Sequence, residues 1–576
     1  MELVNSGPPL SVITITTMEP CFKIAKEDVV VRPIANFHPS LWGDYFIKNP
    51  SLLSTHQKSE EWMKQRVQEL VKDVKNLLRE ARGSMREGMQ LIDALQRLGV
   101  AYHFEHEISE ALSFINSTST SHHSYGDDDL RFVALRFRLL RQHLYDAPSD
   151  VFNQFKDDEG NFKEELKNDL KGLLSLYEAA YLGMPEEHVL DEAIEFTRNN
   201  LMSMSNNIEP WLVKQVAHAL ETPIRRRMSR LEARLYIPIY EEDIEAKNDV
   251  VLELAKLDFH LLQLLHREEV TKISIWWYDL GLARELKFIR DRIVELYFWI
   301  LGVYFEPQYS KGRMMLVKVI TMLSLMDDIY DSYGTLHELQ QFTLAIQRWE
   351  LKQDDAQLDE KLQLGFMAIC NTLKELEDQV LQDGNRCRID TFRRELEKVA
   401  VILLEEAKWR AERYVPLSLA EHLDLSRKTT SYHVLACASL LGIGEEVPKD
   451  TLEWIASFPQ ISKDITNICR LMDDAVDSEF EGEREHVITT ISCCMKKYGD
   501  SWEEAKLRIL GMVENAWKDM NRECLRLNNI IPSYVLVRFV NLACMMETMY
   551  RNSDGYTESA SLKKTISLLL VEPIVM

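Results

Sequence analysis

The stretch Ile320–Asp331, ITMLSLMDDIYD, joins an apolar run of helical pattern to three carboxylates at its end. The apolar part, Ile320–Leu325, predicts a helix buried in a core. Asp327 and Asp331 are four residues apart, so this helix projects both side chains from one face, about one turn apart. Such like charges repel each other unless their oxygens ligate hard cations. A solvated acidic helix end is the alternative in a chain with 92 acidic residues.

A second acidic cluster, with Asp473, Asp474, Asp477 and Glu481, again follows an apolar helical stretch, Ile465–Met472. Positions 473, 477 and 481 lie along one stripe of a helix, so the longer glutamate can reach back toward a shared ion. Two such clusters facing each other across a helical bundle need cations and a bridging anion to neutralise them. Mg²⁺ fits this demand because it prefers oxygen ligands and is commonly held by one or two carboxylates plus substrate phosphates.

Arginines accompany both clusters. Arg290 and Arg292 lie upstream of the first cluster, and Arg470 lies three residues before Asp473. A guanidinium group can bind diphosphate oxygens bidentately. Ordinary surface ion pairs are the alternative for any one of these arginines, but their joint placement favours an anion site.

The rest of the chain predicts a mostly helical protein. Its 576 residues suggest two large domains, and its 21 glycines and 17 prolines are few for its length. The segment around residues 235–249 combines a proline with an acidic stretch, so we place the domain boundary near residue 245. Amphipathic helical patterns occur at Glu60–Arg82, Leu130–Leu144, Leu252–His266, Leu362–Leu381 and Trp502–Leu527.

Composition argues against several classes of protein. The formal charge of -24 disfavours binding to nucleic acid or to anionic membranes. The nine cysteines are scattered and never form Cys-x-x-Cys, so neither a disulfide scaffold nor a zinc site is predicted. The longest apolar run, Leu296–Phe305, is about half of a membrane span. Residues 1–31 lack arginine and contain acids, which is unlike an organelle transit peptide, so we expect a cytoplasmic protein.

From about Arg32 to the C-terminus the sequence resembles the plant class I terpene synthases, specifically the angiosperm sesquiterpene synthase branch. The stretches that carry the resemblance are RPIANFHPSLW (Arg32–Trp42), RDRIVELYFWILGVYFEPQYS (Arg290–Ser310), DDIYDSYGT (Asp327–Thr335), RLMDDAVDSEFEGEREH (Arg470–His486) and YRNSDGYT (Tyr550–Thr557). They are similar to the family's Arg-Pro-x8-Trp element, Arg-x-Arg segment, aspartate-rich motif, second metal motif and diphosphate-closing segment.

The resemblance implies an all-α fold of two helical domains. Residues 1–31 would be an N-terminal extension, 32–245 an α-barrel-like domain without chemistry of its own, and 246–576 the catalytic helical bundle that binds metal. Acid-initiated cyclases that use the N-terminal domain carry Asp-x-Asp-Asp, and this chain has only three consecutive aspartates, 127–129, followed by Leu130. Cyclisation started by protonation is therefore not expected.

The resemblance also implies the reaction. Three Mg²⁺ ions, with Mn²⁺ as an alternative, and the arginines would draw off the diphosphate of farnesyl diphosphate, leaving an allylic carbocation that cyclises to a sesquiterpene. An apolar pocket with aromatic faces would shield and stabilise the cation. A helix break at Thr429–Ser431 resembles one that aims backbone carbonyls at the cation in the family. The protein is expected to act as a monomer.

By family position the site residues divide into three groups. The metal ligands would be Asp327, Asp328, Asp331, Asp473, Asp477 and Glu481. The residues that bind the diphosphate would be Arg290, Arg292, Asp327, Asp331, Arg470 and Asp473. The catalytic residues around the reacting cation would be Trp299, Tyr550, Asp554 and Tyr556, with an ordinary core residue as the alternative for each aromatic side chain.

Two positions depart from the family's pattern. Residue 477 is usually Ser or Thr in the family, whereas this chain has Asp, which makes DDAVD a second aspartate-rich motif. An ionised Asp477 can ligate Mg²⁺ strongly but adds negative charge, and so can alter metal geometry or preference. Glu485 stands where many members have Gly.

Three other functions remain open from the sequence. One is a monoterpene synthase that uses geranyl diphosphate. Another is a chain-elongating prenyl transferase, which also carries two Asp-Asp-x-x-Asp motifs but lacks a large N-terminal helical domain. The last is a non-catalytic helical protein that binds divalent ions, which leaves the arginines and the closing segment without a purpose.

Overall fold

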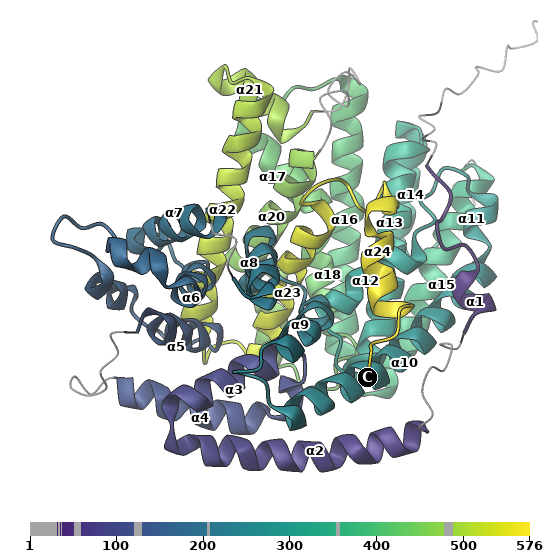
Figure 1. Ribbon diagram of the computed structural model, residues 1–576. Helices are drawn as coiled ribbons and strands as arrows, with labels where there is room; N and C mark the ends of the chain where they lie inside the picture. The colour runs from purple at the N-terminus through teal and green to yellow at the C-terminus, as the bar shows by residue number, and fades with distance from the viewer. Residues whose placement is uncertain are drawn as a thin grey trace, which may run out of the picture.

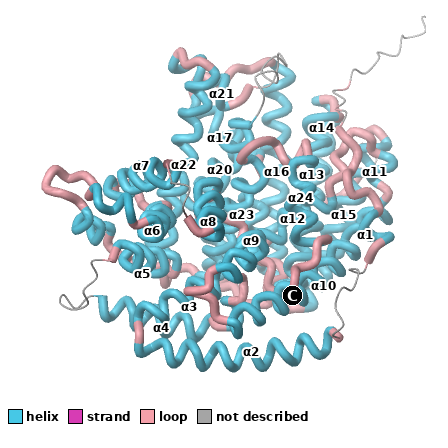
Figure 2. Tube along the Cα trace, in the orientation of Figure 1, coloured by secondary structure: helices cyan, strands magenta, loops and turns pink. Residues whose placement is uncertain are grey.

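The computed structural model describes residues 32, 35, 37–50, 59–119, 129–203, 208–352, 358–476 and 488–576. Within these ranges the chain is helical, and strand-like pairing is limited to one bridge between Lys156 and Phe162 (Figure 2). The predicted all-α class is confirmed. The predicted N-terminal extension, residues 1–31, lies outside the described ranges.

In the N-terminal half, helices α2 to α8 form a layer along the lower and left sides of the molecule in Figure 1, whereas α1 lies on the right side against α10 and α9 lies near the centre. These helices confirm the amphipathic patterns predicted from Glu60 and from Leu130, to within two residues at each end. Their bounds are α1 Tyr45–Lys48, α2 Glu60–Glu80, α3 Met85–Arg97, α4 Glu105–Ser119, α5 Leu130–Gln142, α6 Leu170–Ala180, α7 His188–Met202, α8 Pro210–Glu221 and α9 Ser229–Glu242.

The C-terminal half forms a helical bundle around α12, α13, α18, α20 and α23 (Figure 1). The helices of this half are α10 Asp249–Leu280, α11 Leu282–Glu285, α12 Ile293–Val303, α13 Ser310–Ser332, α14 Leu336–Arg348, α15 Glu360–Gln382, α16 Arg386–Glu412, α17 Leu419–Thr429, α18 Tyr432–Ala438, α19 Lys449–Ala456, α20 Gln460–Val476, α21 Thr490–Tyr498, α22 Trp502–Leu527, α23 Ser533–Tyr550 and α24 Lys563–Leu570.

Local signals fix several of these helix ends. Thr335 and Glu338 form a capping box at the start of α14, and Ser501 and Glu504 form another at the start of α22. The long helix α10 ends at Gly281, whose φ of 68° is easily reached only without a side chain. These caps satisfy backbone groups that a helix end otherwise leaves without partners.

Helix α9 differs from the prediction that residues 235–249 separate two helices. The structure continues α9 through Pro238 as far as Glu242. A proline inside a helix removes one backbone hydrogen bond and costs about 3 kcal/mol. Tyr236, Ile237 and Ile239 are all buried, and burial of such side chains offsets a cost of this size. The predicted domain boundary near residue 245 lies in the turn between α9 and α10.

Close packing of α12 against α23 positions the centre of the bundle. Gly302 on α12 leaves no room for a side chain, because a Cβ atom there would lie 1.9 Å from Sδ of Met545 on α23. Trp299, one turn earlier on α12, thereby faces Tyr550 at the end of α23, with ring centroids 6.1 Å apart. Both rings are buried.

A membrane span is not found among the described helices, since none is both long and apolar enough to cross a bilayer.

Candidate active site

The first acidic cluster lies on the last turns of α13 and is held by Arg290, which precedes α12. Nη2 of Arg290 donates to Oδ2 of Asp327 at 2.5 Å, and Nε donates to Oδ1 of Asp328 at 2.8 Å. The backbone N–H of Arg290 also donates to Oδ2 of Asp328, at 2.7 Å. Arg290 therefore joins Asp327 and Asp328 directly.

The two carboxyl groups differ in exposure. The side chain of Asp328 is 2% exposed, whereas that of Asp327 is 36% exposed. Burial raises the pKa of Asp328 to about 7, although Arg290 opposes the shift. Loss of water and the neighbouring charge of Asp331 also raise the pKa of Asp327. Both shifts favour the protonated forms, so cations near the cluster would stabilise its full negative charge.

Asp331 is bound by an arginine that the sequence analysis did not single out. Nη1 of Arg410, on α16, donates to Oδ1 of Asp331 at 2.9 Å, and Nη2 donates to the carbonyl of Tyr330 at 2.6 Å. Arg410 lies 79 residues along the chain from Asp331. The carboxylates of α13 thus meet cationic groups on two sides.

The second acidic cluster begins on the last turn of α20. Nη1 of Arg470 donates to Oδ2 of Asp473 at 3.0 Å and to Oδ1 of Asp474 at 3.3 Å. Asp474 is buried, and its Oδ2 accepts from the backbone N–H of Thr490 at the start of α21, so it supports the fold. The predicted ligands Asp477 and Glu481, like Glu485, lie outside the described residues.

A second residue that the sequence analysis missed, Glu406 on α16, connects the two clusters. Oγ1 of Thr429 donates to Oε1 of Glu406 at 3.1 Å, and Nη2 of Arg470 donates to the same hydroxyl at 3.5 Å. Loss of water, followed by the charge of Asp331, raises the pKa of Glu406 to about 7. The sequence feature that could have indicated Glu406 is the pair of glutamates inside an amphipathic helix, in LLEEAKW.

The charges of the two clusters act on each other. Burial raises the pKa of Asp473 to about 7, and the negative charges of Asp554, Asp474 and Asp327 add to the shift while Arg470 opposes it. These carboxyl groups therefore lie near one another at the ends of α13 and α20, and we call the region between them the acidic recess.

The C-terminal segment that follows α23 lies against this recess. Oδ1 of Asp554 accepts from the backbone N–H groups of Tyr556 and Thr557, both at 2.9 Å, which fixes the turn. The hydroxyl of Tyr556 is hydrogen-bonded to Ser324, one turn before the first cluster on α13. The guanidinium carbon of Arg290 lies 4.7 Å from the centre of the Tyr556 ring.

Three of the aromatic rings of the site surround Trp299. Its ring centroid lies 5.7 Å from Tyr556 and 6.1 Å from both Tyr550 and Tyr432. Nε1 of Trp299 donates to the hydroxyl of Tyr432 at 2.7 Å. Tyr432 was not predicted, although it directly follows the predicted helix break at Thr429–Ser431. The structure has that break between α17 and α18, with Ser431 at a φ of 59°.

Arg292 is placed differently from Arg290. It is 1% exposed, and its guanidinium donates to the backbone carbonyls of Tyr556, Thr557 and His38 at 3.1, 3.0 and 2.9 Å, and to that of Asp291 at 3.0 Å. It contacts none of the acidic side chains of the two clusters in the described residues. Arg292 therefore holds two distant chain segments together, and its predicted contact with diphosphate stays a prediction.

The side chains present suit a hard divalent cation. The donors on α13 and α20 are carboxylate oxygens, which Mg²⁺ prefers, and sulfur or imidazole ligands of the kind that favour zinc are not among them. Within the described ranges, no group of three His, Cys, Asp or Glu side chains is placed so that the three could hold a metal ion together. Sparse ligation by the protein suits Mg²⁺, which usually completes its shell with water and substrate phosphates.

A separate hollow of ≈ 640 Å³ is lined from the N-terminal half by residues that include His143 and Tyr145, and from the end of α22 by Arg522 and Arg526. It contains none of the predicted site residues, so the acidic recess and not this hollow is the candidate site.

Comparison with known families agrees with the geometry. Residues 278–519 match the terpene synthase family, metal binding domain, and residues 41–220 match the terpene synthase, N-terminal domain. The chain belongs to the terpene synthase family. The metal-binding match spans both acidic clusters of this terpene synthase, together with Arg290, Glu406 and Arg410.

Individual members of the family align along nearly the whole chain. An alpha-humulene synthase of Zingiber zerumbet is 46% identical over 95% of this chain and 98% of its own length. A sesquiterpene synthase of Cananga odorata is 43% identical over 97% of this chain and 98% of its own length. A crystal structure of isoprene synthase from grey poplar (Populus x canescens), in complex with three Mg²⁺ ions and dimethylallyl-S-thiolodiphosphate, superposes with a TM-score of 0.83 at 32% identity, covering 92% of this chain and 99% of that one.

Proposed function

We propose that this terpene synthase is a sesquiterpene synthase, a lyase that ionises farnesyl diphosphate and cyclises the resulting cation. The observation that carries the proposal is the recess in which the carboxylates of α13 and α20 meet Arg290, Arg410 and Arg470. The names of relatives with 46% and 43% identity support a sesquiterpene product over a monoterpene one.

Breaking the C–O bond requires stabilisation of the departing diphosphate. Mg²⁺ supplies Lewis-acid stabilisation of the leaving group when it is bound. Asp327 and Asp331 on α13 and Asp473 on α20 would hold the ions, together with Asp328, Asp477 and Glu481. Arg290 and Arg470 would then donate to the diphosphate oxygens, and fixed donors need no reorganisation as charge develops.

Residues deeper in the bundle would control the carbocation. Trp299 packs edge to face against both Tyr550 and Tyr556, all three rings are buried, and the negative face of an aromatic ring stabilises a nearby cation. Asp554 fixes the turn that carries Tyr556 over the recess. Exclusion of water by this turn would let ring closure precede capture of the cation.

The finer assignments belong to the same proposal. Residues 246–576 would carry the chemistry and 32–245 would support it, with three Mg²⁺ ions as the working metals and Mn²⁺ as a substitute. The grey poplar enzyme in complex with three Mg²⁺ ions supports that number. We propose a cytoplasmic monomer.

The test is product analysis by gas chromatography and mass spectrometry. The purified protein is incubated with Mg²⁺ and, separately, with geranyl, farnesyl or geranylgeranyl diphosphate. We expect sesquiterpenes from the farnesyl substrate at the highest kcat/KM. Preference for geranyl diphosphate would make it a monoterpene synthase, and longer prenyl diphosphates after addition of isopentenyl diphosphate would make it a chain-elongating enzyme. Formation of no terpene from any substrate would contradict the proposal.

A further inference from the structure

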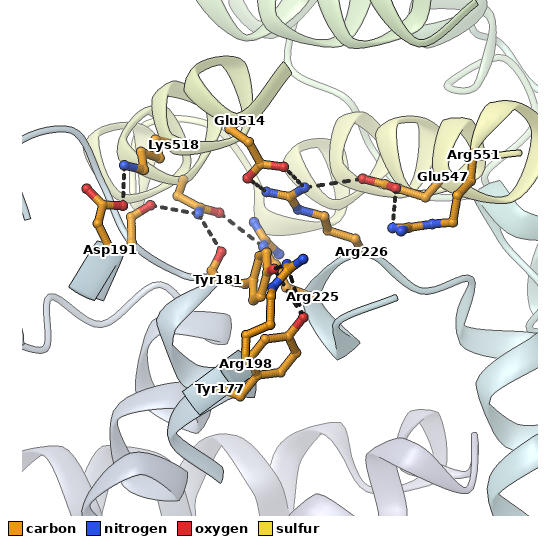
Figure 3. A network of polar contacts seen from close by, with 12 residues as sticks. Tyr177, Tyr181, Asp191, Arg198, Arg225, Arg226, Glu514, Lys518, Glu547 and Arg551 are labelled. Atoms are coloured by element: carbon orange, nitrogen blue, oxygen red, sulfur yellow. Dashed lines mark hydrogen bonds and ion pairs between the residues drawn. The ribbon is translucent and has the colours of Figure 1, made fainter. Parts of the chain in front are cut away.

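The short turn between α8 and α9, Ile224–Arg226, joins the N-terminal helices to the catalytic bundle. Figure 3 shows Arg226 reaching between α22 and α23. Its two terminal nitrogens donate to the carboxylate of Glu514 on α22 at 2.7 and 2.5 Å, and Nη1 also donates to Glu547 on α23 at 3.4 Å. Arg226 and Glu547 are 5% and 6% exposed. One buried guanidinium therefore bridges two helices of the bundle.

The same turn is anchored in the N-terminal half. Glu178 on α6 accepts from the backbone N–H of Ile224 at 2.5 Å and from Nη2 of Arg227 at 2.9 Å. Nη1 of Arg227 donates to Glu232 on α9 at 2.7 Å, and Arg227 and Glu232 are both buried. The turn is consequently fixed to the N-terminal helices, and the position of Arg226 is set by that half of the molecule.

Glu547 also contacts the chain segment that lies beside the candidate active site. Its second oxygen, Oε2, accepts from Nη2 of Arg551 at 2.6 Å (Figure 3). Arg551 directly follows Tyr550, the last residue of α23 and a member of the aromatic cluster. It also begins the segment that ends at Tyr556 and Thr557, whose carbonyls are bound by Arg292. The segment over the recess is thus tied at its start by Glu547 and at its end by Arg292.

We infer that Arg226 and Glu547 are positioning residues for the reaction. They fix the end of α23, and with it Tyr550 and the segment of residues 551–557, against the N-terminal helices. This inference rests on the proposed function. On this inference the N-terminal half affects catalysis by positioning groups of the catalytic bundle and contributes no reacting group itself. Such positioning matters because an error of about 1 Å in a positioned group can cost two orders of magnitude in rate.

One substitution weakens the contact of α23 with Arg551 and leaves the bonds between Arg226 and α22 in place. Glu547→Gln keeps the size of the side chain and removes the charge that pairs with Arg551. The two bonds from Arg226 to Glu514 remain, so the buried guanidinium keeps a carboxylate partner and the fold survives. Arg551→Gln tests the same link from a side chain that is 30% exposed, and the buried carboxylate of Glu547 keeps Arg226 as its partner.

A matched control lies in the same interface. Nζ of Lys518 on α22 is 2.5 Å from Oδ1 of Asp191 on α7 (Figure 3). This ion pair also joins the N-terminal half to α22, but within the described part of the chain neither side chain is hydrogen-bonded or ion-paired to α23 or to Arg551. Asp191→Asn therefore weakens the interface without touching the proposed route.

The experiment compares Glu547→Gln, Arg551→Gln and Asp191→Asn with the unchanged protein. With Mg²⁺ and farnesyl diphosphate, we expect the first two variants to raise the fraction of acyclic and hydroxylated products about tenfold and to change KM less than about twofold. Amide hydrogen exchange of residues 551–557, in the presence of Mg²⁺ and inorganic diphosphate, should quicken by about tenfold in the same two variants. Glu547→Asp keeps the negative charge, so its product fraction and its exchange rate should change less than those of Glu547→Gln.

Identical product ratios and exchange rates in Glu547→Gln and Asp191→Asn would overturn the inference. The exchange measurement needs no turnover, so it decides the inference even if the unchanged protein makes no terpene, an outcome that would refute the proposed function alone.

Discussion

The two acidic clusters are built in different ways. The carboxylates of α13 are held by arginines from elsewhere in the fold, Arg290 before α12 and Arg410 on α16. Asp473 on α20 is held by Arg470, one turn earlier on the same helix. The first cluster therefore takes its shape only when distant parts of the chain pack together, whereas the pairing in the second cluster forms with the helix itself. The fold therefore preorganises the first cluster, whereas the second cluster can adjust to its ligands.

The largest expected effect comes from removing the first cluster. Asp327→Ala combined with Asp331→Ala should lower kcat by more than about 10³-fold, because the diphosphate loses the metal ions that stabilise its departure. Activity is measured by product formation from farnesyl diphosphate at saturating Mg²⁺. The helical circular-dichroism spectrum should be unchanged.

Asp390→Ala, at an exposed position on α16, is the control for loss of an aspartate as such. Turnover at the normal rate in the double variant would refute the role of the first cluster.

Replacing the arginine of each cluster by glutamine tests how strongly that cluster depends on it. Arg290→Gln should lower kcat about 10²-fold, since it frees two carboxylates and removes the cation beside Tyr556. Arg470→Gln should cost only about tenfold, because its bonds to Asp473 and Asp474 are local and longer. Steady-state kinetics of both variants shows which substitution lowers kcat more. Equal losses would show that the two clusters depend on their arginines alike.

The pH dependence follows from the raised pKa values near 7 of Asp328 and Asp473. In the unfolded chain these groups lose their protons near pH 4, so between about pH 4 and pH 7 the folded protein binds more protons and its free energy of unfolding falls as pH rises. Metal binding requires the ionised groups. Mg²⁺ with inorganic diphosphate should therefore raise Tm by roughly 2 °C more at pH 8 than at pH 6.

Thermal unfolding at the two pH values, with and without these ligands, measures this difference. Asp328→Asn should reduce it, and a rise in Tm that is the same at both pH values would contradict the assigned protonation states.

The smallest effect is expected at Asp477. Asp477→Ser restores the residue type usual in the family and should change the ratio of Mg²⁺-supported to Mn²⁺-supported activity by about threefold, with unchanged Tm. Asp477→Asn keeps the size without the charge and should behave like the serine variant if charge sets the preference. An unaltered ratio in both variants would remove Asp477 from the ligand set.

Much of the fold could be predicted from local pattern. Apolar spacing of three and four residues gave α2, α15 and α22 with ends within about two residues of those observed. Helix α10 is longer than the predicted Leu252–His266, because Asn248 caps its start and Gly281 ends it. Helix α9 continues through Pro238 because burial of its neighbouring apolar side chains outweighs the tendency of proline to end a helix.

The site could be predicted only in part. Asp327, Asp331 and Asp473 stand out because carboxylates interrupt apolar helices. Arg410, Glu406 and Tyr432 were missed because each meets the site through packing between helices far apart in the chain. The sequence also placed Arg292 beside Arg290 without showing that one faces carboxylates and the other backbone carbonyls, since both lie in the irregular segment before α12, where no helical or strand period sets side-chain directions.

The central claim is that the ends of α13 and α20 form a single clamp for metal ions and diphosphate. A crystal structure of the protein with Mn²⁺ and inorganic diphosphate, with anomalous scattering to locate the metal, tests it most directly. We predict metal peaks roughly 2.0–2.6 Å from carboxylate oxygens of both Asp327 or Asp331 and Asp473, with the diphosphate between them. Metal bound at only one of the two helices, or diphosphate bound away from both, would contradict the account.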